Sequence, residues 1–578
     1  MSANEIRKQF GDDLDEKLIE ECVSMCKIYQ QSPEDLFYKW ESIHLNLSSH
    51  SEIRAPFTMD SVASLKASLN RGLATGSKKA QPKQKTMRGG RNLNPAFATR
   101  YSGAASHGTA VKAEPDAMDV DIPSRVSAAV TFKGPKEDIA SRKRRAYRYM
   151  YEKVSERSEG KALLLTILDE QIDEFAELIR EHYKIPASAL GDPAASTDED
   201  VTVVGRIVQE SEAESGTKLT ESSLTLETSR MMGSGSRVPL RFAPSLKIRG
   251  GALGAGGISF FPGALVALKG KNGGGGSFLA SEILAPPPLR ARPAKSFSDP
   301  GYSEPPFSMC IASGPYTSDS DLSFKPWRAF LPIIKSKKPT VVLLIGPFID
   351  ASHPLLRAGA IDTTPLKLFH AQFTKPLRSY LDSSPGSVAI LVPSVRDLVS
   401  FHAVYPQCEF SSEVSNGDSR IHLLPNPAQF SINNIKFAVT SVDVLFHLRK
   451  EELLKRGEEI NSTVPSSPED TGTDSMANTC RHMLQQRSFY PLFPVPKELA
   501  HEVNLDVTHS PLLRLGESDG GNVAPDVLII PSRLKHFSKI LDATSTLNPS
   551  FLTKGTYAVV QTGPSGSIKP EVVKMDSS

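Results

Sequence analysis

The feature that most constrains the fold is a series of short apolar stretches in the C-terminal half of the chain. From about residue 305 onward, stretches of strand length alternate with segments of helical pattern, and several of these strands are apolar at every position. A strand that is apolar on both faces belongs to a sheet that is covered on both sides. This half is therefore predicted to be an α/β domain. The predicted strands are FSMCIASG, TVVLLIG, SVAILVP, IHLLPN, IKFAVTS, PDVLIIP and TYAVVQ.

The rest of the chain is long enough for further domains. At 578 residues, three or four are expected if a domain takes roughly 150 residues. The net charge of +2 does not indicate a general nucleic-acid binder. Five scattered cysteines fit a reducing compartment better than a disulfide scaffold. Because no signal peptide or bilayer-length apolar stretch is visible, the chain is expected to be soluble and intracellular, without a membrane partner.

Residues 1–75 are predicted to form a small helical domain. Leu18, Cys22 and Cys26 fall on one face of a predicted helix. The two cysteines fit half of a metal site or a helix core. The core interpretation is favoured, because no matching Cys or His pair lies nearby in the sequence.

The next two segments are predicted to link this domain to the rest. Residues 76–135 lack hydrophobic periodicity and cannot bury enough apolar surface to offset their chain entropy, so they are predicted to be a disordered linker. Residues 136–185 are predicted to be a helical connector. Its first part carries a basic cluster that fits a nuclear import signal or the solvated start of a helix equally well. The cluster consists of Arg142, Lys143, Arg144 and Arg145.

Residues 186–290 contain β-type stretches separated by Gly, Ser and Asn. The stretches are VTVVGRIVQE, SSLTLET, RVPLRF, GALVALKG and FLASEIL. Several strands within such a short segment predict a small barrel of the OB-fold type. An OB-fold that binds single-stranded DNA needs stacking aromatics and a basic groove. Aromatics are sparse here, so DNA contact is expected to be weak or indirect.

Residues 291–578 complete the chain as the predicted α/β domain. One stretch, about residues 455–480, is polar and of low complexity, and is predicted to be a mobile surface loop. Ser467 precedes a proline within it and is a possible phosphorylation site.

The predicted strand ends can be compared with a two-metal phosphoesterase site. Such a site needs carboxylate, imidazole and amide ligands at the carboxyl ends of neighbouring strands. The positions that would supply them are Ser313, Gly314, Pro315, Gly346, Pro347, Asp350, Arg396, Asp397, Pro531 and Ser532. Pro347 stands where a bridging carboxylate is required, and Arg396 would repel a dication. Two isolated aspartates cannot hold two metal ions, so no catalytic residue, metal or cofactor is predicted, and the chain is not expected to be an enzyme.

The order of these segments resembles one protein family, the B subunits (second subunits) of eukaryotic DNA polymerase alpha–primase. The residues that carry the resemblance are IASGPYTSDSDLSFKPW, VVLLIGPFID, LVPSVRDL, LLPNPAQFSINNIKFAVTSVDVLFHL and PDVLIIPSRLKHF, together with VTVVGRI, SFFPGALVALKGKN and SPEDLFYKW. No single one is specific, but their order is.

The resemblance implies a multidomain α+β architecture: an N-terminal helical domain, a disordered tether, an OB-fold barrel, and a calcineurin-like phosphodiesterase sandwich without its metal ligands. It also implies a non-catalytic nuclear scaffold that binds the C-terminal domain of the polymerase catalytic subunit. Primase subunits would join through the complex, and replication factors through the N-terminal domain. The second subunits of polymerases epsilon and delta are alternatives, as is an active metallophosphoesterase with substituted ligands.

Overall fold

A computed structural model of the chain describes its folded parts. The described residues are 6–7, 15–29, 33, 36, 58–59, 61–62, 66, 159–209, 218–274, 276–292, 305–464, 470, 472–516, 522–563 and 567–575. The chain divides into two compact units, Met1–Val120 with Tyr149–Gly160, and Asp121–Arg148 with Lys161–Ser578. The predicted linker, the basic cluster at 142–145 and Ser467 lie outside the described residues.

The first unit contains helix α2 (Glu16–Tyr29). Cys22 and Cys26 are buried on this helix beside Leu18 and Ile19, as the core interpretation predicts. Burial raises the pKa of the Cys22 thiol to about 12, so this sulfur is held as an uncharged core group.

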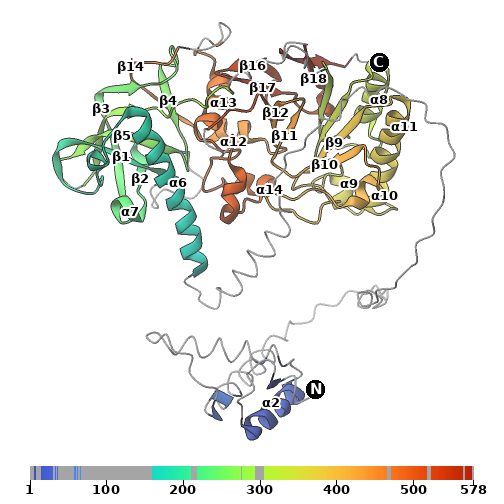
Figure 1. Ribbon diagram of the computed structural model, residues 1–578, viewed down its shortest axis with the longest axis horizontal. Coiled ribbons are helices and arrows are strands. Elements are labelled where there is room, and N and C mark those ends of the chain that lie inside the picture. The colour runs from blue at the N-terminus through green and yellow to red at the C-terminus, as the bar shows by residue number, and fades with distance from the viewer. Residues whose placement is uncertain are drawn as a thin grey trace, which may run out of the picture. The chain divides into compact units, whose positions relative to one another are not determined.

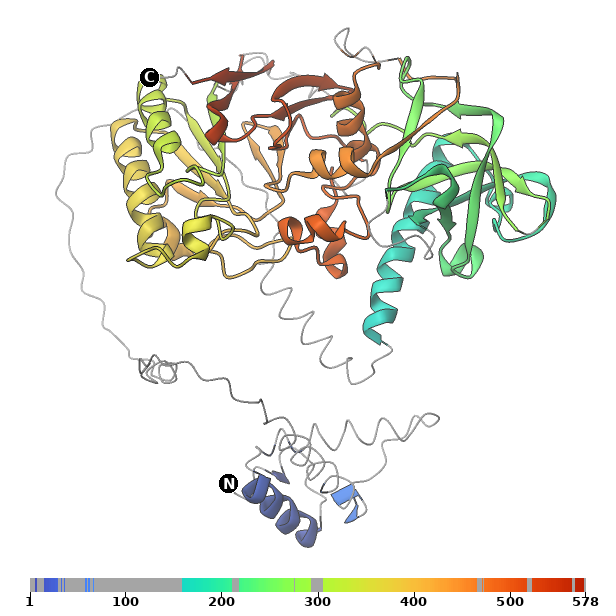
Figure 2. The same cartoon turned by 180° about the vertical axis from the view of Figure 1, so that it is seen from behind.

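The described part of the second unit begins with a long helix and a closed barrel (Figures 1 and 2). The elements are α6 (Glu159–Tyr183), β1 (Thr197–Gln209), β2 (Leu224–Glu227), α7 (Arg230–Gly233), β3 (Arg237–Arg249), β4 (Gly257–Phe260), β5 (Leu265–Asn272) and β6 (Phe278–Leu284). The strands pair in the order β3-β2-β1-β5-β6, and a β3–β6 pairing closes the barrel. Its interior is filled by alternate residues of these strands, including Val203, Leu226, Leu240 and Leu268.

Helix α6 belongs to the barrel domain. Ile172, Phe175 and Ile179 recur at helical spacing and pack against Val204 and Ala267 of the barrel. The prediction of a connector ending at residue 185 is therefore wrong for this helix. The amphipathic pattern marks the buried face, but it does not say which partner covers that face.

Two sheets form the remainder of the second unit. The first follows the order β10-β9-β8-β7-β18-β19, and the second the order β11-β12-β15-β17-β16. Their bounds are β7 (Ser308–Ser313), β8 (Val341–Ile345), β9 (Val388–Val392), β10 (Ile421–Leu423), β11 (Ala428–Ile432), β12 (Ile435–Val439), β15 (Val527–Ile529), β16 (Phe537–Leu541), β17 (Thr544–Asn548), β18 (Thr556–Thr562) and β19 (Ile568–Lys574). All seven predicted strands are present.

Successive side chains of a strand point to opposite faces of its sheet. Each sheet therefore packs one face against the other sheet, and the two sheets form a sandwich. In β8, Leu343 faces the core between the sheets, whereas Leu344 faces the helices that cover the first sheet. These helices are α8 (Lys325–Lys337), α9 (Pro354–Arg357), α10 (Pro365–Phe369) and α11 (Lys375–Ser383). They line the outer side of the first sheet in Figure 1.

The outer face of the second sheet is joined to the barrel. Helices α12 (Val444–Glu451), α13 (Ser475–Gln485) and the short α14 (Ala500–Val503) lie on this side of the sheet (Figure 1). Leu528 of the sheet, Leu448 of α12, Met483 of α13 and Phe261 beside the barrel belong to one hydrophobic core. The barrel and the sandwich are therefore packed together as one body.

The predicted loop at about residues 455–480 is wrong over its described residues. β13 (Leu453–Arg456) pairs with β4, and β14 (Glu458–Ile460) pairs with β3, so this stretch extends the barrel sheets. Further along, α13 is buried on most of its surface. The polar composition wrongly predicted a loop because both strands expose one side to solvent. Their pairing partners, β4 and β3, also lie about two hundred residues earlier in the chain.

None of the helices described for this chain is long and apolar enough to cross a membrane.

Candidate functional site

The loops that follow β7 and β8 are packed against each other. The Gly314 amide donates to the Ile345 carbonyl at 2.8 Å, and the Gly346 amide donates to the Val392 carbonyl at 2.8 Å. A Cβ on Gly314 would lie well under 3.0 Å from the backbone of Pro347. A Cβ on Gly346 would lie 2.7 Å from the Ser394 nitrogen. Backbone from neighbouring loops therefore occupies the space around both glycines.

A cluster of buried aromatic side chains packs against these loops. The Tyr316 hydroxyl hydrogen-bonds to the carbonyls of Ala312 and Ile345, at 3.0 Å each. Its ring stacks on Phe348 with 5.2 Å between centroids. Trp327 and Phe373 complete the buried cluster. Neither Tyr316 nor Phe348 was expected at this site from the sequence, although each follows a Gly-Pro pair at a strand end.

Asp397 is a buried carboxylate held by backbone donors. It accepts hydrogen bonds from the amides of Phe348, Ile349 and Ser394, the last two at 3.1 and 2.8 Å. Burial raises the pKa of Asp397 to about 7, although these hydrogen bonds act to lower it. Through these hydrogen bonds Asp397, which lies in the loop after β9, holds the loop after β8 in place.

The raised pKa of Asp397 gives a pH prediction. Between its ordinary value of 3.8 and about 7, the folded state holds a proton that the unfolded state has lost. The contribution of Asp397 to the free energy of unfolding is therefore expected to fall by roughly 2 to 4 kcal/mol across this window and to level off above it.

The measurement is urea unfolding of the wild-type chain and Asp397→Asn at several pH values between about 4 and 8. The difference between the two curves isolates this group. This matters because His482, whose pKa burial lowers to about 4, acts in the opposite direction. Parallel curves would contradict the prediction.

Asp350 is bound by an arginine from the next loop. The Arg396 guanidinium contacts both carboxylate oxygens of Asp350, with Nε to Oδ1 at 3.1 Å. The Ser352 amide and hydroxyl donate to the same Oδ1, at 2.9 and 2.7 Å. Such a bidentate pair uses the oxygens that a metal ligand would present.

A second arginine network lies at the ends of β12 and β15. Arg533 donates from Nε to Asp443 at 2.9 Å and also pairs with Glu502. Glu502 contacts His447 at 3.4 Å, and the other nitrogen of that ring lies 3.0 Å from the Tyr490 hydroxyl. Burial acts to raise the pKa of Glu502, but His447 and Arg533 outweigh it and lower it to about 2.

None of these five residues was predicted from the sequence. Asp443 and Arg533 each stand two residues beyond the end of a predicted strand, which is a usable signal. Glu502 comes from α14, and only tertiary packing brings it to Arg533.

The remaining predicted positions serve local structure. The Ser532 amide donates to the Asn548 side chain at 2.9 Å, and its hydroxyl accepts from the Leu534 amide at 3.1 Å. Ser313 is buried at the end of β7, Pro315 is half-buried in the loop that follows β7, and Pro531 is buried after β15. These side chains offer no set of metal donors.

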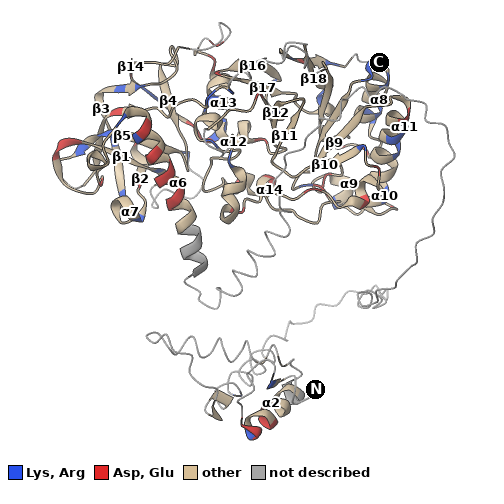
Figure 3. Ribbon diagram, viewed as in Figure 1, with Lys and Arg blue, Asp and Glu red and all other residues tan. Residues whose placement is uncertain are grey.

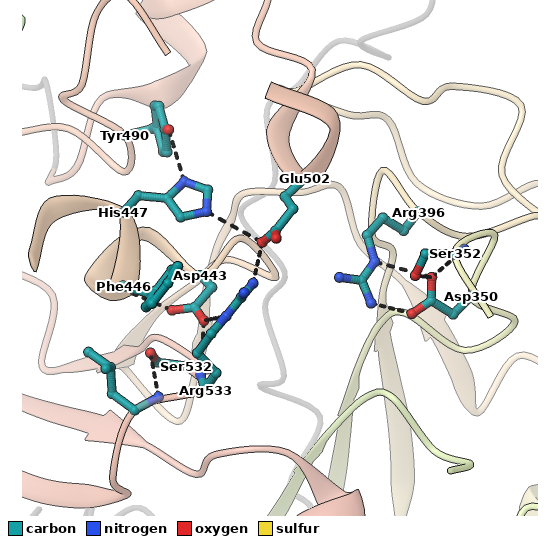
Figure 4. Close-up of polar contacts among 11 residues, drawn as sticks. Asp350, Ser352, Arg396, Asp443, Phe446, His447, Tyr490, Glu502, Ser532 and Arg533 are labelled. Atoms are coloured by element: carbon teal, nitrogen blue, oxygen red, sulfur yellow. Dashed lines mark hydrogen bonds and ion pairs between the residues drawn. The ribbon is translucent and has the colours of Figure 1, made fainter. Parts of the chain in front are cut away.

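The arrangement does not fit a two-metal centre. Figure 4 shows two separate networks, with Asp350 turned to Arg396 and Asp443 and Glu502 turned to Arg533. Each of these carboxylates already has a cationic partner, and a nearby guanidinium opposes the binding of a dication. Among the described residues, no group of three or more His, Cys, Asp or Glu is placed to hold a metal ion.

The sequence matches two families of known proteins. The family of B subunits of DNA polymerases alpha and epsilon matches residues 309–539, and the family of OB domains of the DNA polymerase alpha B subunit matches residues 165–286. The second match starts within α6, in agreement with the packing of that helix on the barrel. Residues 309–539 thus match the class of polymerase alpha and epsilon B subunits, and the OB prediction is confirmed by the second match.

Comparison with individual relatives distinguishes the alpha subunits of this class from the epsilon subunits. The chain is 31% identical to the DNA polymerase alpha B subunit of Schizosaccharomyces pombe, across 96% of each protein. It is 30% identical to the corresponding protein of Saccharomyces cerevisiae and 31% identical to that of Bos taurus, each time over 68% of this chain and 57% of the relative. The chain belongs to the family of DNA polymerase alpha B subunits.

Proposed function

We propose that the chain is a non-catalytic accessory subunit of DNA polymerase alpha. The observation that carries the proposal is the pairing of Asp350 with Arg396 and of Asp443 and Glu502 with Arg533. In this proposal the two-sheet sandwich is a calcineurin-like phosphodiesterase fold that has exchanged metal ligands for internal ion pairs. The names of the relatives support the polymerase assignment.

The barrel and the sandwich together form the proposed platform for the C-terminal domain of the catalytic subunit. Their shared core and the strands β13 and β14 support this role, because a platform of fixed geometry keeps a bound partner in one orientation. Primase subunits would associate through the complex, and the N-terminal domain would recruit replication factors. The proposed site of action is the nucleus, with weak or indirect contact to DNA.

Co-purification tests the platform and the importance of α6. Residues 159–578 are expected to co-purify with the alpha catalytic subunit, whereas residues 1–75 alone are not. A fragment of residues 186–578 is expected to be less stable by about 5 kcal/mol, because it exposes the barrel surface under Ile172, Phe175 and Ile179, each worth about 1.5 to 3 kcal/mol. Its unfolding in urea measures this loss.

If the catalytic subunit of polymerase epsilon or delta co-purified instead, the chain would be assigned to that polymerase. Binding by residues 1–75 alone would contradict the platform.

Elemental analysis tests the non-catalytic assignment. Purified full-length chain is expected to carry no stoichiometric manganese, iron or zinc and to show no phosphodiesterase turnover. Two metal ions per chain together with turnover would establish an active enzyme instead.

A further inference from the structure

A groove lies between α6 and the segment 486–514. It encloses a cavity of about 320 Å³. Ile167, Gln171 and Leu178, spaced along one side of α6, line one wall. The ion-paired sites in Figure 4 are separate from it, apart from Tyr490, which lines both.

Arg206 contributes a buried positive charge to this groove. Its side chain is 2% exposed. One terminal nitrogen donates to the Leu168 carbonyl at 2.8 Å and to the Gln171 side chain at 3.0 Å, and both acceptors are neutral. The carboxylate of Glu227 approaches only to 3.9 Å. A buried cation normally has a closer counter-charge.

Arg487 contributes a second positive charge, which is half-buried. It donates to the Gln485 and Pro287 carbonyls at 3.0 and 3.1 Å and to the Asn522 side chain at 3.3 Å. In the part of the chain that the structure describes, it pairs with no carboxylate. Burial lowers the pKa of Arg206 and of Arg487 to about 10, in line with incomplete compensation of both charges.

The walls of the groove favour a peptide over a nucleic acid. Phe493, Leu505 and Val507 give one wall an apolar surface, which a phosphodiester backbone would not bury. Glu170 also lines the groove and would repel a polyanion, whereas Glu174 is paired with Arg514, a cationic residue of the facing segment that lines the groove too. Figure 3 shows that acidic residues run along α6, so the helix does not present the continuous basic stripe that nucleic acid requires.

We propose that this groove binds a segment of a partner protein in which one or two acidic residues are flanked by apolar ones. A carboxylate of that segment would accept hydrogen bonds from Arg487 or Arg206, and its apolar side chains would cover the opposite wall. The inference goes beyond the proposed function, because it holds for the chain alone, whether or not the catalytic subunit is the partner.

The test is a selection of short random peptides, displayed on phage, on the purified full-length chain and on Arg487→Gln. Peptides retained only by the wild type are expected to combine acidic and apolar residues. By fluorescence anisotropy, they are expected to bind Arg487→Gln about tenfold more weakly, because a charge-assisted hydrogen bond is lost. Replacing the peptide's acidic residues by amides is expected to have the same effect.

Two further variants keep the test decisive. Leu178→Asp places a negative charge on the groove wall and is expected to weaken binding without altering either arginine. Arg241→Gln, on the exposed barrel surface, is expected to leave it unchanged, because among the described residues its guanidinium contacts only backbone carbonyls. An empty wild-type-specific set, selected peptides without acidic residues, or competition by oligothymidylate would overturn the proposal. Tighter binding after deletion of the chain's own acidic stretch, residues 111–123, would do so too, because that stretch would then be the occupant.

Discussion

Gly314→Ala is expected to destabilise the second unit by about 3 kcal/mol or more. A Cβ at this position would lie well under 3.0 Å from the carbonyl oxygen of Pro347 and 2.9 Å from the nitrogen of the same residue. Backbone atoms cannot move aside as the end of a flexible side chain can, and overpacking of a well-packed site typically costs about 1 to 3 kcal/mol. Here the two loops must separate, which also disturbs Tyr316 and Phe348 beneath them.

Urea unfolding followed by tryptophan fluorescence measures the effect, because Trp327 lies in the aromatic cluster under these loops. Gly276→Ala is the matched control. A Cβ there meets no atom within 4 Å, so its effect is expected to stay within about 0.5 kcal/mol. Equal stability of the two variants would show that the loops are not in the contact described.

Arg533→Met is expected to cost about 2 to 4 kcal/mol, somewhat less than removing one partner of a fully buried ion pair, because the Arg533 side chain is 34% exposed. The Asp443 and Glu502 side chains are 6% and 13% exposed, and both would lose their cationic partner. The guanidinium also lies 4.4 Å from the centroid of the Phe446 ring, a contact that methionine replaces only in part. Urea unfolding at about neutral pH gives the loss of stability.

A second substitution separates the orphaned charge from the lost packing. Adding Glu502→Gln to Arg533→Met is expected to recover part of the stability, since the neutral amide no longer needs a cation. Arg237→Met serves as the surface control, because Arg237 is 62% exposed and pairs with Glu227 at the barrel surface. Its cost is expected to stay below about 1 kcal/mol. If Arg533→Met cost no more than this control, the network at the ends of β12 and β15 would not be a buried one.

The site could be anticipated in part. The strand ends are visible in the sequence, so the absence of metal ligands beside Pro347 and Arg396 could be recognised without coordinates. The cationic partners of the carboxylates at the strand ends were not visible. The pairing of Arg396 with Asp350 requires loops after two different strands, and the pairing of Arg533 with Glu502 requires a short helix that carries no strong sequence signal.

The sequence by itself determined the barrel segment, seven strands of the sandwich and the family resemblance. The hydrophobic period of an element, and the continuous apolar run of a strand buried on both faces, are properties of short stretches. They can therefore be recognised without tertiary information. Only the tertiary structure decided that α6 belongs to the barrel, that the polar stretch containing β13 and β14 extends the barrel sheets, and that arginines neutralise the carboxylates at the strand ends. Each of these depends on contacts between segments distant in the chain. Such contacts are selected by the packing of the whole unit rather than by neighbouring residues.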